Sequence, residues 1–130
     1  MNGNGEILLV KSHKWGNKYT VAGGHIELGE RSEEAVKREI REEVGLDVEP
    51  VRILLVQEAI FPKDYIKHEH YIFMDYLCRT ESSSVKLDNE EIQEYLWISP
   101  NGALQLDLES FTRNLVIEYL RNSNTARAVT

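Results

Sequence analysis

The sequence predicts one globular domain of the mixed α/β (α+β) class, spanning residues 1–130. Short runs rich in β-branched and aromatic residues alternate with segments of helical periodicity, so strands and helices follow one another along the chain. A chain of 130 residues can bury a hydrophobic core without disulfides or a structural metal. The sequence contains no internal repeat and no low-complexity linker, so nothing in it divides the domain.

The apolar runs give the predicted strands in order. They are 6–10, 19–24, 51–61, 70–78 and 94–99, and the second of them closes on two glycines. Residues 62–69 are polar and predict a connection between the third and fourth strands. Pro100 opens a short helix, and residues 109–122 have the spacing of a C-terminal amphipathic helix. Residues 123–130 show no pattern and are expected to form a flexible tail.

The segment after the paired glycines predicts a helix with defined ends. Ser32 is its expected N-cap, because a serine hydroxyl can accept a hydrogen bond from an amide of the first turn. Glu33 and Glu34 follow in that turn, where negative charge suits the helix dipole. Gly45 ends the helix, since glycine readily takes the left-handed conformation required there.

The N-terminal NGNG is a strong hairpin-turn signal, yet only Met1 precedes it. Its partner strand would therefore lie before the recorded start or come from elsewhere. The alternative is a flexible N-terminus before an edge strand.

Composition and charge exclude several classes of protein. The formal net charge of −7 argues against general nucleic-acid binding, which needs a basic surface. Cys78 is the only cysteine, so the chain has neither a disulfide framework nor a cysteine-built zinc site. No apolar run approaches the roughly 18 residues that span a bilayer, and the N-terminus lacks a signal-peptide pattern. A cytoplasmic protein without membrane partners is expected.

Three glutamates gather on one side of the predicted helix. Positions three and four apart are neighbours on a helix, so Glu39, Glu42 and Glu43 form one stripe. A separate apolar stripe consists of Val36, Ile40 and Val44. Like charges four residues apart cost a few tenths of a kcal/mol. Either this face is simply solvated, or a cation binds there. Hard oxygen ligands of this kind suit Mg²⁺.

The stripe belongs to a longer pattern, GHIELGERSEEAVKREIREEVGL, over residues 24–46. Gly24 is followed after five residues by Glu30 and after seven more by Arg38-Glu39 and an aliphatic residue. One residue later comes a Glu-Glu pair, and after one more residue a glycine and a second aliphatic residue. This pattern resembles the Nudix box, the signature of the Nudix hydrolases, at all nine specified positions. A chance match at a given start is on the order of 10⁻¹⁰. Many members carry proline before the paired glycines, where this chain has Ala22.

The resemblance implies a Nudix fold, an α/β/α sandwich with a mixed sheet on which the box helix packs. It also implies a Mg²⁺ site, with Mn²⁺ as a second candidate, held by Glu39, Glu42, Glu43 and the carbonyl of Gly23. Arg38 would orient a box glutamate by a salt bridge, and Glu30 would have a supporting role.

Members of the family often use one more glutamate outside the box, a few residues before a tryptophan. Here Glu91 lies six residues before Trp97, with Glu90 and Glu94 as alternatives. Either Glu39 or Glu91 would then be the catalytic base.

The implied activity is Mg²⁺-dependent hydrolysis of a nucleoside diphosphate linked to another group, by water attack on phosphorus. Candidate substrates are nucleoside triphosphates, ADP-ribose and nucleotide sugars, and Pro62 tilts the choice mildly toward ADP-ribose. Candidate substrate-binding residues are Lys18, Tyr19, Phe61 and Tyr65; Trp15 is a further ring on which a base could stack. Two alternatives stay open: a non-catalytic module that senses nucleotides, and an isomerase of isoprenoid diphosphates. Dimers are common in the family, and the sequence does not decide for or against one.

Overall fold

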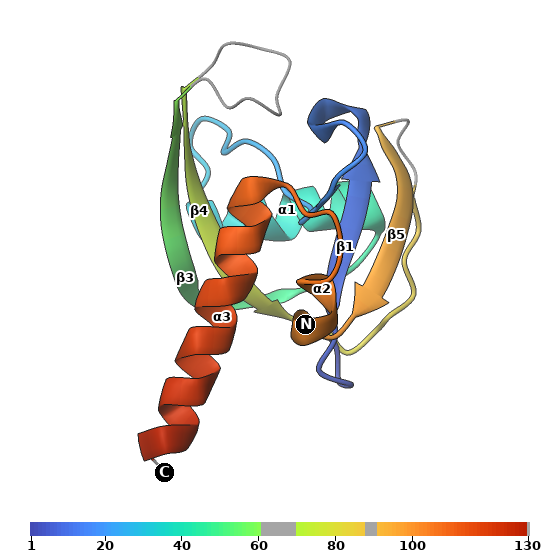
Figure 1. The fold of residues 1–130 in the computed structure, drawn as a ribbon. Helices are drawn as coiled ribbons and strands as arrows, with labels where there is room; N and C mark the ends of the chain where they lie inside the picture. Colours follow the sequence, from blue (N-terminus) through green and yellow to red (C-terminus); the bar gives the residue numbers. More distant parts are fainter. Residues whose placement is uncertain (61–69, 88–90, 130) are drawn as a thin grey trace.

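The computed structural model describes residues 1–60, 70–87 and 91–129 (Figure 1). Its elements are β1 (Ile7–Ser12), η1 (His13–Trp15), β2 (Tyr19–Thr20), α1 (Ser32–Val44), β3 (Glu49–Ile60), β4 (His70–Arg79), β5 (Ile92–Ile98), α2 (Pro100–Ala103) and α3 (Ser110–Val129). The predicted α+β class is confirmed. The polar connection predicted over residues 62–69 lies outside the described residues.

The described strands form two antiparallel sheets. One has the order β2-β1-β5, with Leu9 paired to Leu96 and Val10 to Tyr95. The other is the β3–β4 hairpin. A mixed sheet was expected; parallel pairing among the described residues is limited to an isolated bridge between Tyr19 and Leu108. Figure 1 shows the two sheets on either side of the molecule, with α3 in front of them and α1 behind.

Strand β1 is buried on both faces, which explains its unbroken apolar run. Successive side chains of a strand point to opposite faces. Leu9 is fully buried in a cluster with residues of α2 and α3. Val10, next to it, is 2% exposed in a second cluster that includes Val44 of α1. Helices therefore cover both sides of this sheet, the sandwich arrangement that was expected.

The ends of α1 agree with the sequence prediction at one end only. Gly45 takes the left-handed conformation (φ 70°), and its N–H donates to the carbonyl oxygen of Arg41 at 3.0 Å. The N-cap prediction was wrong. Arg31 is the N-cap residue, and Ser32 is the first helical residue. The Ser32 hydroxyl instead shares a 2.6 Å hydrogen bond with the Tyr76 hydroxyl of β4, so this side chain joins the helix to the hairpin.

The NGNG segment forms a turn, as its sequence predicts. Gly5 has φ 74°, and its N–H donates to the carbonyl oxygen of Asn2 at 3.2 Å. The ammonium group of Met1 donates to the carbonyl oxygen of Cys78 at 2.7 Å, and the N–H of Thr80 donates to the carbonyl oxygen of Met1 at 2.9 Å. The first residue is thereby hydrogen-bonded to the end of β4.

Two predicted boundaries differ from the structure. Strand β2 covers only Tyr19–Thr20, and the chain then runs on through the paired glycines without strand pairing. Helix α3 continues to Val129, beyond the end expected at Asn122. No helix among the described residues is long and apolar enough to cross a membrane.

The environment of Cys78 predicts an unreactive thiol. Burial is the largest cause that raises the pKa of Cys78, to about 11. Thiolate is the reactive form of cysteine, so it is nearly absent at neutral pH. We expect slow labelling by a thiol reagent at pH 7 in the native protein and rapid labelling after denaturation in urea. Equally fast labelling of both states would contradict this prediction.

Candidate active site

Arg38 is the centre of the polar cluster on α1. Its guanidinium contacts four carboxylates and one backbone carbonyl. The contacts are Nε to Glu30 Oε2 at 2.7 Å, Nη2 to Glu30 Oε1 at 3.0 Å, Nη1 to Glu39 Oε1 at 2.8 Å, Nη1 to Glu42 Oε2 at 3.1 Å, Nη1 to Glu27 Oε1 at 3.7 Å and Nη2 to the His25 carbonyl oxygen at 2.9 Å. The pair with Glu30 is two-pronged, the geometry that best fixes a guanidinium.

This arrangement shows what offsets the repulsion within the glutamate stripe. Arg38 lies between Glu39 and Glu42 and donates a hydrogen bond to each. Hydrogen bonds from Arg38 are also the largest cause that lowers the pKa of Glu30. Hydrogen bonds to Glu30 and Glu39 raise the pKa of Arg38 itself, so the guanidinium stays charged. Arg38 thus offsets part of the repulsion between these carboxylates, and its single positive charge leaves the cluster negative overall.

The glycines before the helix bring the backbone against two of the glutamates. The N–H of Gly23 donates to Glu43 Oε2 at 2.8 Å. Gly24 lies so close to the carboxylate of Glu39 that a Cβ at this position would overlap it. Glu39 is therefore held between Arg38 on one side and a bare stretch of backbone on the other.

The donor set has the chemistry that Mg²⁺ prefers. Three carboxylates at i, i+3 and i+4 and the nearby Gly23 carbonyl are hard oxygen ligands. Their side chains do not converge on one point, however. Among the described residues, no group of three His, Cys, Asp or Glu side chains is arranged to hold a metal ion. Glu39 and Glu42 turn toward Arg38, and Glu43 turns toward the amide of Gly23. The residue types fit the ion, and closing the site requires rotation of these side chains.

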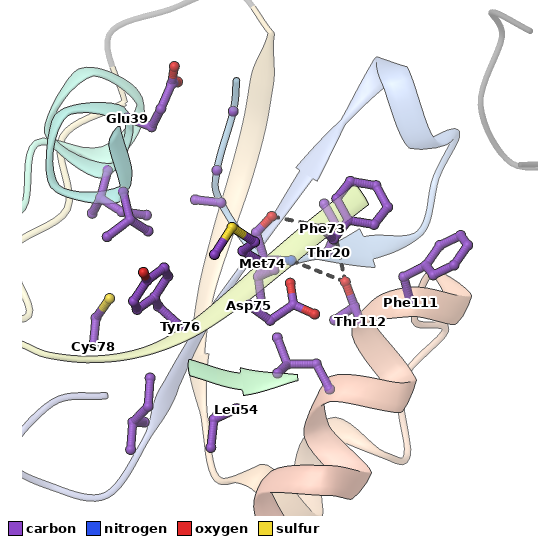
Figure 2. Close-up of a pocket in the computed structure, with 18 of the residues that line it drawn as sticks. Thr20, Glu39, Leu54, Phe73, Met74, Asp75, Tyr76, Cys78, Phe111 and Thr112 are labelled. Atoms are coloured by element: carbon purple, nitrogen blue, oxygen red, sulfur yellow. Dashed lines mark hydrogen bonds between the residues drawn. The ribbon is translucent and has the colours of Figure 1, made fainter. Parts of the chain in front are cut away.

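A cavity of about 590 Å³ adjoins the box residues (Figure 2). Its wall includes Glu39 of α1 with Gly23 and Gly24. Leu54 of β3, a long run of β4 and the first half of α3 contribute further parts of the wall, together with residues of β1 and α1. In Figure 2, Glu39 lies near one end, and Phe73 and Phe111 lie on the opposite side. A pocket of this size, mostly apolar with a few polar groups, is typical of small-molecule sites.

Aromatic rings form a chain along this cavity. The His25 ring is 5.9 Å from that of Tyr71, which stacks on Phe73 at 5.7 Å with 16° between the planes. Phe73 also contacts Phe111 of α3 at 5.4 Å and Trp15 at 6.4 Å. All five residues line the cavity. The rings therefore lead from the loop beside the glutamates to the start of α3.

Polar side chains gather at the α3 end of the cavity. Asp75 of β4 accepts a 2.8 Å hydrogen bond from Gln57 Nε2 of β3. The hydroxyls of Thr20 and Thr112 share a 2.9 Å hydrogen bond. The buried carboxylate of Glu109 accepts the N–H of Thr112 at 3.0 Å and caps the helix. The Thr112 hydroxyl also accepts the N–H of Val21 at 3.3 Å, so this network holds the strand that leads to Gly23.

Asp75 is expected to lower stability at neutral pH. Burial is the largest cause that raises its pKa; the nearby charge of Glu109 raises it further, and the Gln57 hydrogen bond opposes both. A carboxyl whose pKa is higher when folded contributes stability that is complete below its unfolded pKa and is lost as the pH rises through the folded value. Asparagine does not ionise, so the Asp75→Asn protein does not lose this stability as the pH rises. Its Tm should exceed that of the wild type at pH 7, and the two Tm values should approach each other near pH 3.5. Thermal melts across this range test it; a lower Tm at pH 7 would contradict the prediction.

The three candidates for the additional glutamate outside the box differ in their surroundings. Glu94 pairs with Lys11 Nζ at 3.1 Å across the β1–β5 ladder, so this charge is engaged in the sheet. Glu91 is exposed just before β5, where its carbonyl oxygen accepts a hydrogen bond from Gln93. Glu90 lies outside the described residues.

Of the four substrate-binding candidates from the sequence, the two that the structure describes do not line the cavity. Tyr19 packs beside the core with the Lys11 ammonium 4.6 Å from its ring centre, and neither Lys18 nor Tyr19 lines the cavity. Phe61 and Tyr65, like Pro62, lie outside the described residues.

Sequence reasoning missed the polar end of the cavity. The apolar pattern of residues 70–78 predicts that Tyr71 and Phe73 are packing residues, and it assigns no role to Asp75. A signal was present, because an aspartate inside the apolar run YIFMDYLC is a buried charge that needs a reason. Thr112 and Glu109 carry no such signal, since hydroxyls and acids at a helix start read as ordinary caps.

Comparison with known proteins supplies independent findings. Residues 1–119 match the family model described as the NUDIX domain. The chain is 37% identical over 102 residues to the nucleoside triphosphatase NudI of Escherichia coli K12, and the match covers 74% of this chain and 72% of that protein. The fold resembles the crystal structure of a MutT NUDIX hydrolase from Burkholderia pseudomallei, with a TM-score of 0.73, 25% identity and 88% of each chain covered. It also resembles a MutT protein from Methanosarcina mazei Go1, with a TM-score of 0.75, 24% identity, and 94% of this chain and 88% of that chain covered.

Proposed function

The chain belongs to the Nudix hydrolase family, and from that premise we propose that it hydrolyses the diphosphate linkage of nucleoside triphosphates with Mg²⁺. One observation carries this proposal. The cavity has Glu39 of the box and the glycines that precede the helix at one end and stacked aromatic rings along its wall, so it offers both a place for phosphates and a place for a base. The triphosphate is favoured over ADP-ribose and nucleotide sugars by the named activity of the NudI relative.

The residues that would hold Mg²⁺ are Glu39, Glu42, Glu43 and the carbonyl of Gly23. When bound, the ion would neutralise phosphate charge and increase the electrophilicity of phosphorus. Arg38 keeps Glu39 and Glu42 on one side of the helix through its hydrogen bonds, and the Glu39 side chain lines the cavity. The Gly23 amide donates a hydrogen bond to Glu43 and so orients that carboxylate.

Glu39 is our first choice for orienting and deprotonating the attacking water. Its side chain is only 17% exposed and lines the cavity, whereas Glu42 is 59% exposed and does not. Arg38 donates a 2.8 Å hydrogen bond to Glu39 and so orients the group that would accept the proton. Glu91 remains the second candidate for the base. The carboxylate of the base would take a proton from the water, and the water oxygen would form a bond to phosphorus. The bridging P–O bond would break at the same time, and the leaving phosphate group would depart with its electron pair.

The proposal is tested by phosphate release from nucleoside triphosphates, ADP-ribose and nucleotide sugars, with Mg²⁺, Mn²⁺ or EDTA. Inorganic pyrophosphatase and alkaline phosphatase in separate wells reveal pyrophosphate and monoester products. We expect metal-dependent turnover that is fastest with triphosphates. Nucleotide binding without turnover in any well would overturn the proposal in favour of a sensor, and turnover of ADP-ribose alone would replace the substrate class.

A further inference from the structure

We propose that Asp75 makes this site select nucleotides whose base presents an exocyclic amino group. The carboxylate would accept a hydrogen bond from that group inside the cavity. The inference rests on the proposed function, because it concerns which nucleotide the same site prefers. It assigns to β4 a role in specificity in addition to its place in the hairpin.

The orientation of Asp75 is fixed by its neighbours. Gln57 Nε2 donates to Asp75 Oδ2 at 2.8 Å and to the carbonyl oxygen of Phe111 at 2.9 Å. Asn114 Nδ2 of α3 donates to Gln57 Oε1 at 3.1 Å. Gln57 is thus held at both ends of its amide, and its NH₂ group must face Asp75. Gln57 in turn fixes the orientation of Asp75, so Asp75 can bind a ligand with little loss of side-chain entropy.

The second carboxylate oxygen of Asp75 is available to a ligand. Within the part of the chain that the structure describes, Oδ1 receives no hydrogen bond from a protein group. No buried side-chain oxygen or nitrogen of the described residues lacks a partner, so Oδ1 is not sealed in the interior. Asp75 lines the cavity, and Figure 2 shows its carboxylate among the lining side chains, so an oxygen without a protein partner is within reach of a bound molecule.

The aromatic rings lie on the same face of β4 as Asp75, so a base stacked on them would lie close to this carboxylate. Tyr71, Phe73 and Asp75 alternate along β4, so the two rings and the carboxylate share one face of the strand. Tyr71 is at the His25 end, next to the loop that carries the box glycines. A base stacked on this wall with its phosphates toward Glu39 would direct its edge to Asp75.

Charge at this end of the cavity favours a donor over an acceptor. The carboxylates of Asp75 and Glu109 interact, and both Glu109 oxygens already accept hydrogen bonds from α3. A carboxylate is the natural acceptor for the N4 amino group of cytosine. A carbonyl oxygen in the same place would face negative charge with no donor. The site should therefore prefer an amino group to an oxo group at the corresponding base position.

Two matched substrate pairs test this preference. CTP and UTP carry an amino or an oxo group at C4, and ATP and ITP carry them at C6. We expect wild-type kcat/KM to be about 10-fold or more higher for the amino member of the pair that the cavity accepts, since one good side-chain contact discriminates by roughly this factor.

The decisive variant is Asp75→Asn. Gln57 has only its NH₂ group to offer, so the oxygen of the introduced amide takes the place of Oδ2 and the amide NH₂ faces the cavity. The acceptor becomes a donor, and the amino-to-oxo ratio of kcat/KM should fall below 1. Asp47→Asn is the matched control, because Asp47 is 81% exposed and pairs with Arg41 outside the cavity. It should keep the wild-type ratio.

A second variant guards against a folding defect. Gln57→Met removes the donor that orients Asp75 and keeps a similar side-chain volume, so the ratio should shrink toward 1 without inverting. Equal kcat/KM for both members of each pair in the wild type, or a ratio unchanged in folded Asp75→Asn, would overturn this inference and leave the hydrolase standing. Absence of turnover on every nucleotide would instead refute the proposed function and this inference with it.

Discussion

Replacing Glu43 by glutamine is expected to lower kcat more than about 100-fold while the fold stays intact. Loss of a residue that only orients a metal ligand costs about 10–100-fold, so loss of a proposed ligand should cost more. Glutamine keeps the size and one oxygen of the side chain, and that oxygen can still accept the Gly23 N–H. The measurement is Mg²⁺-dependent turnover of the best nucleoside triphosphate, together with a thermal melt of each protein.

Glu33→Gln is the matched control for this variant. It removes a charge from the exposed first turn of the same helix and should leave kcat within about twofold, with at most a small loss of helix-dipole stabilisation. Mg²⁺ titration followed by calorimetry should show weaker binding for Glu43→Gln alone. Near-normal turnover by a Glu43→Gln protein that melts like the wild type would refute the assignment of Glu43 to the metal.

Replacing Gly24 by alanine is expected to lower kcat by about 10–100-fold with little change in Tm. The new Cβ would overlap the Glu39 carboxylate, which must then leave its position beside Arg38. The obstacle is the mobile end of a side chain, so the fold can adapt while the geometry of the site is lost. A loss of this size in kcat is typical when a group that orients a metal ligand is displaced. Steady-state kinetics and a thermal melt measure both parts of the prediction.

Gly23→Ala provides the comparison, because its Cβ would meet no heavy atom within 4 Å. Its loss of kcat should be clearly smaller than that of Gly24→Ala, although the two glycines are adjacent. Equal losses in both variants would mean that the loop backbone matters and that the contact with Glu39 does not.

Local sequence was enough to place most elements of the fold. The strand predicted over 51–61 is β3 at Glu49–Ile60, and that over 70–78 is β4 at His70–Arg79. β-branched and aromatic side chains suit a pleated, half-buried surface, so runs of these residues predict strands from local sequence alone. The 19–24 strand shrank to Tyr19–Thr20, because pairing requires a neighbour that local propensity does not supply.

Part of the candidate site was likewise predictable from local sequence, and part depends on the tertiary structure. Spacing alone put Glu39, Glu42 and Glu43 on one stripe, the family resemblance pointed to Arg38 as their partner, and the structure shows Arg38 bonded to the first two. Spacing could not show that Gly24 lies against Glu39, since that contact joins a loop to a helix face 15 residues away. It also could not show that Glu94 pairs with Lys11, because that contact depends on the register of β1 and β5.

The sequence by itself indicated the family and its class of chemistry through the resemblance of residues 24–46 to the Nudix box, and helical spacing placed the three glutamates on one stripe. Only the tertiary structure decided the surroundings of Asp75. It brings together Gln57 of β3, Asp75 of β4 and Asn114 of α3, three residues from distant parts of the chain. Side chains that meet across a sheet and a helix depend on register and packing, and no local pattern encodes such a meeting.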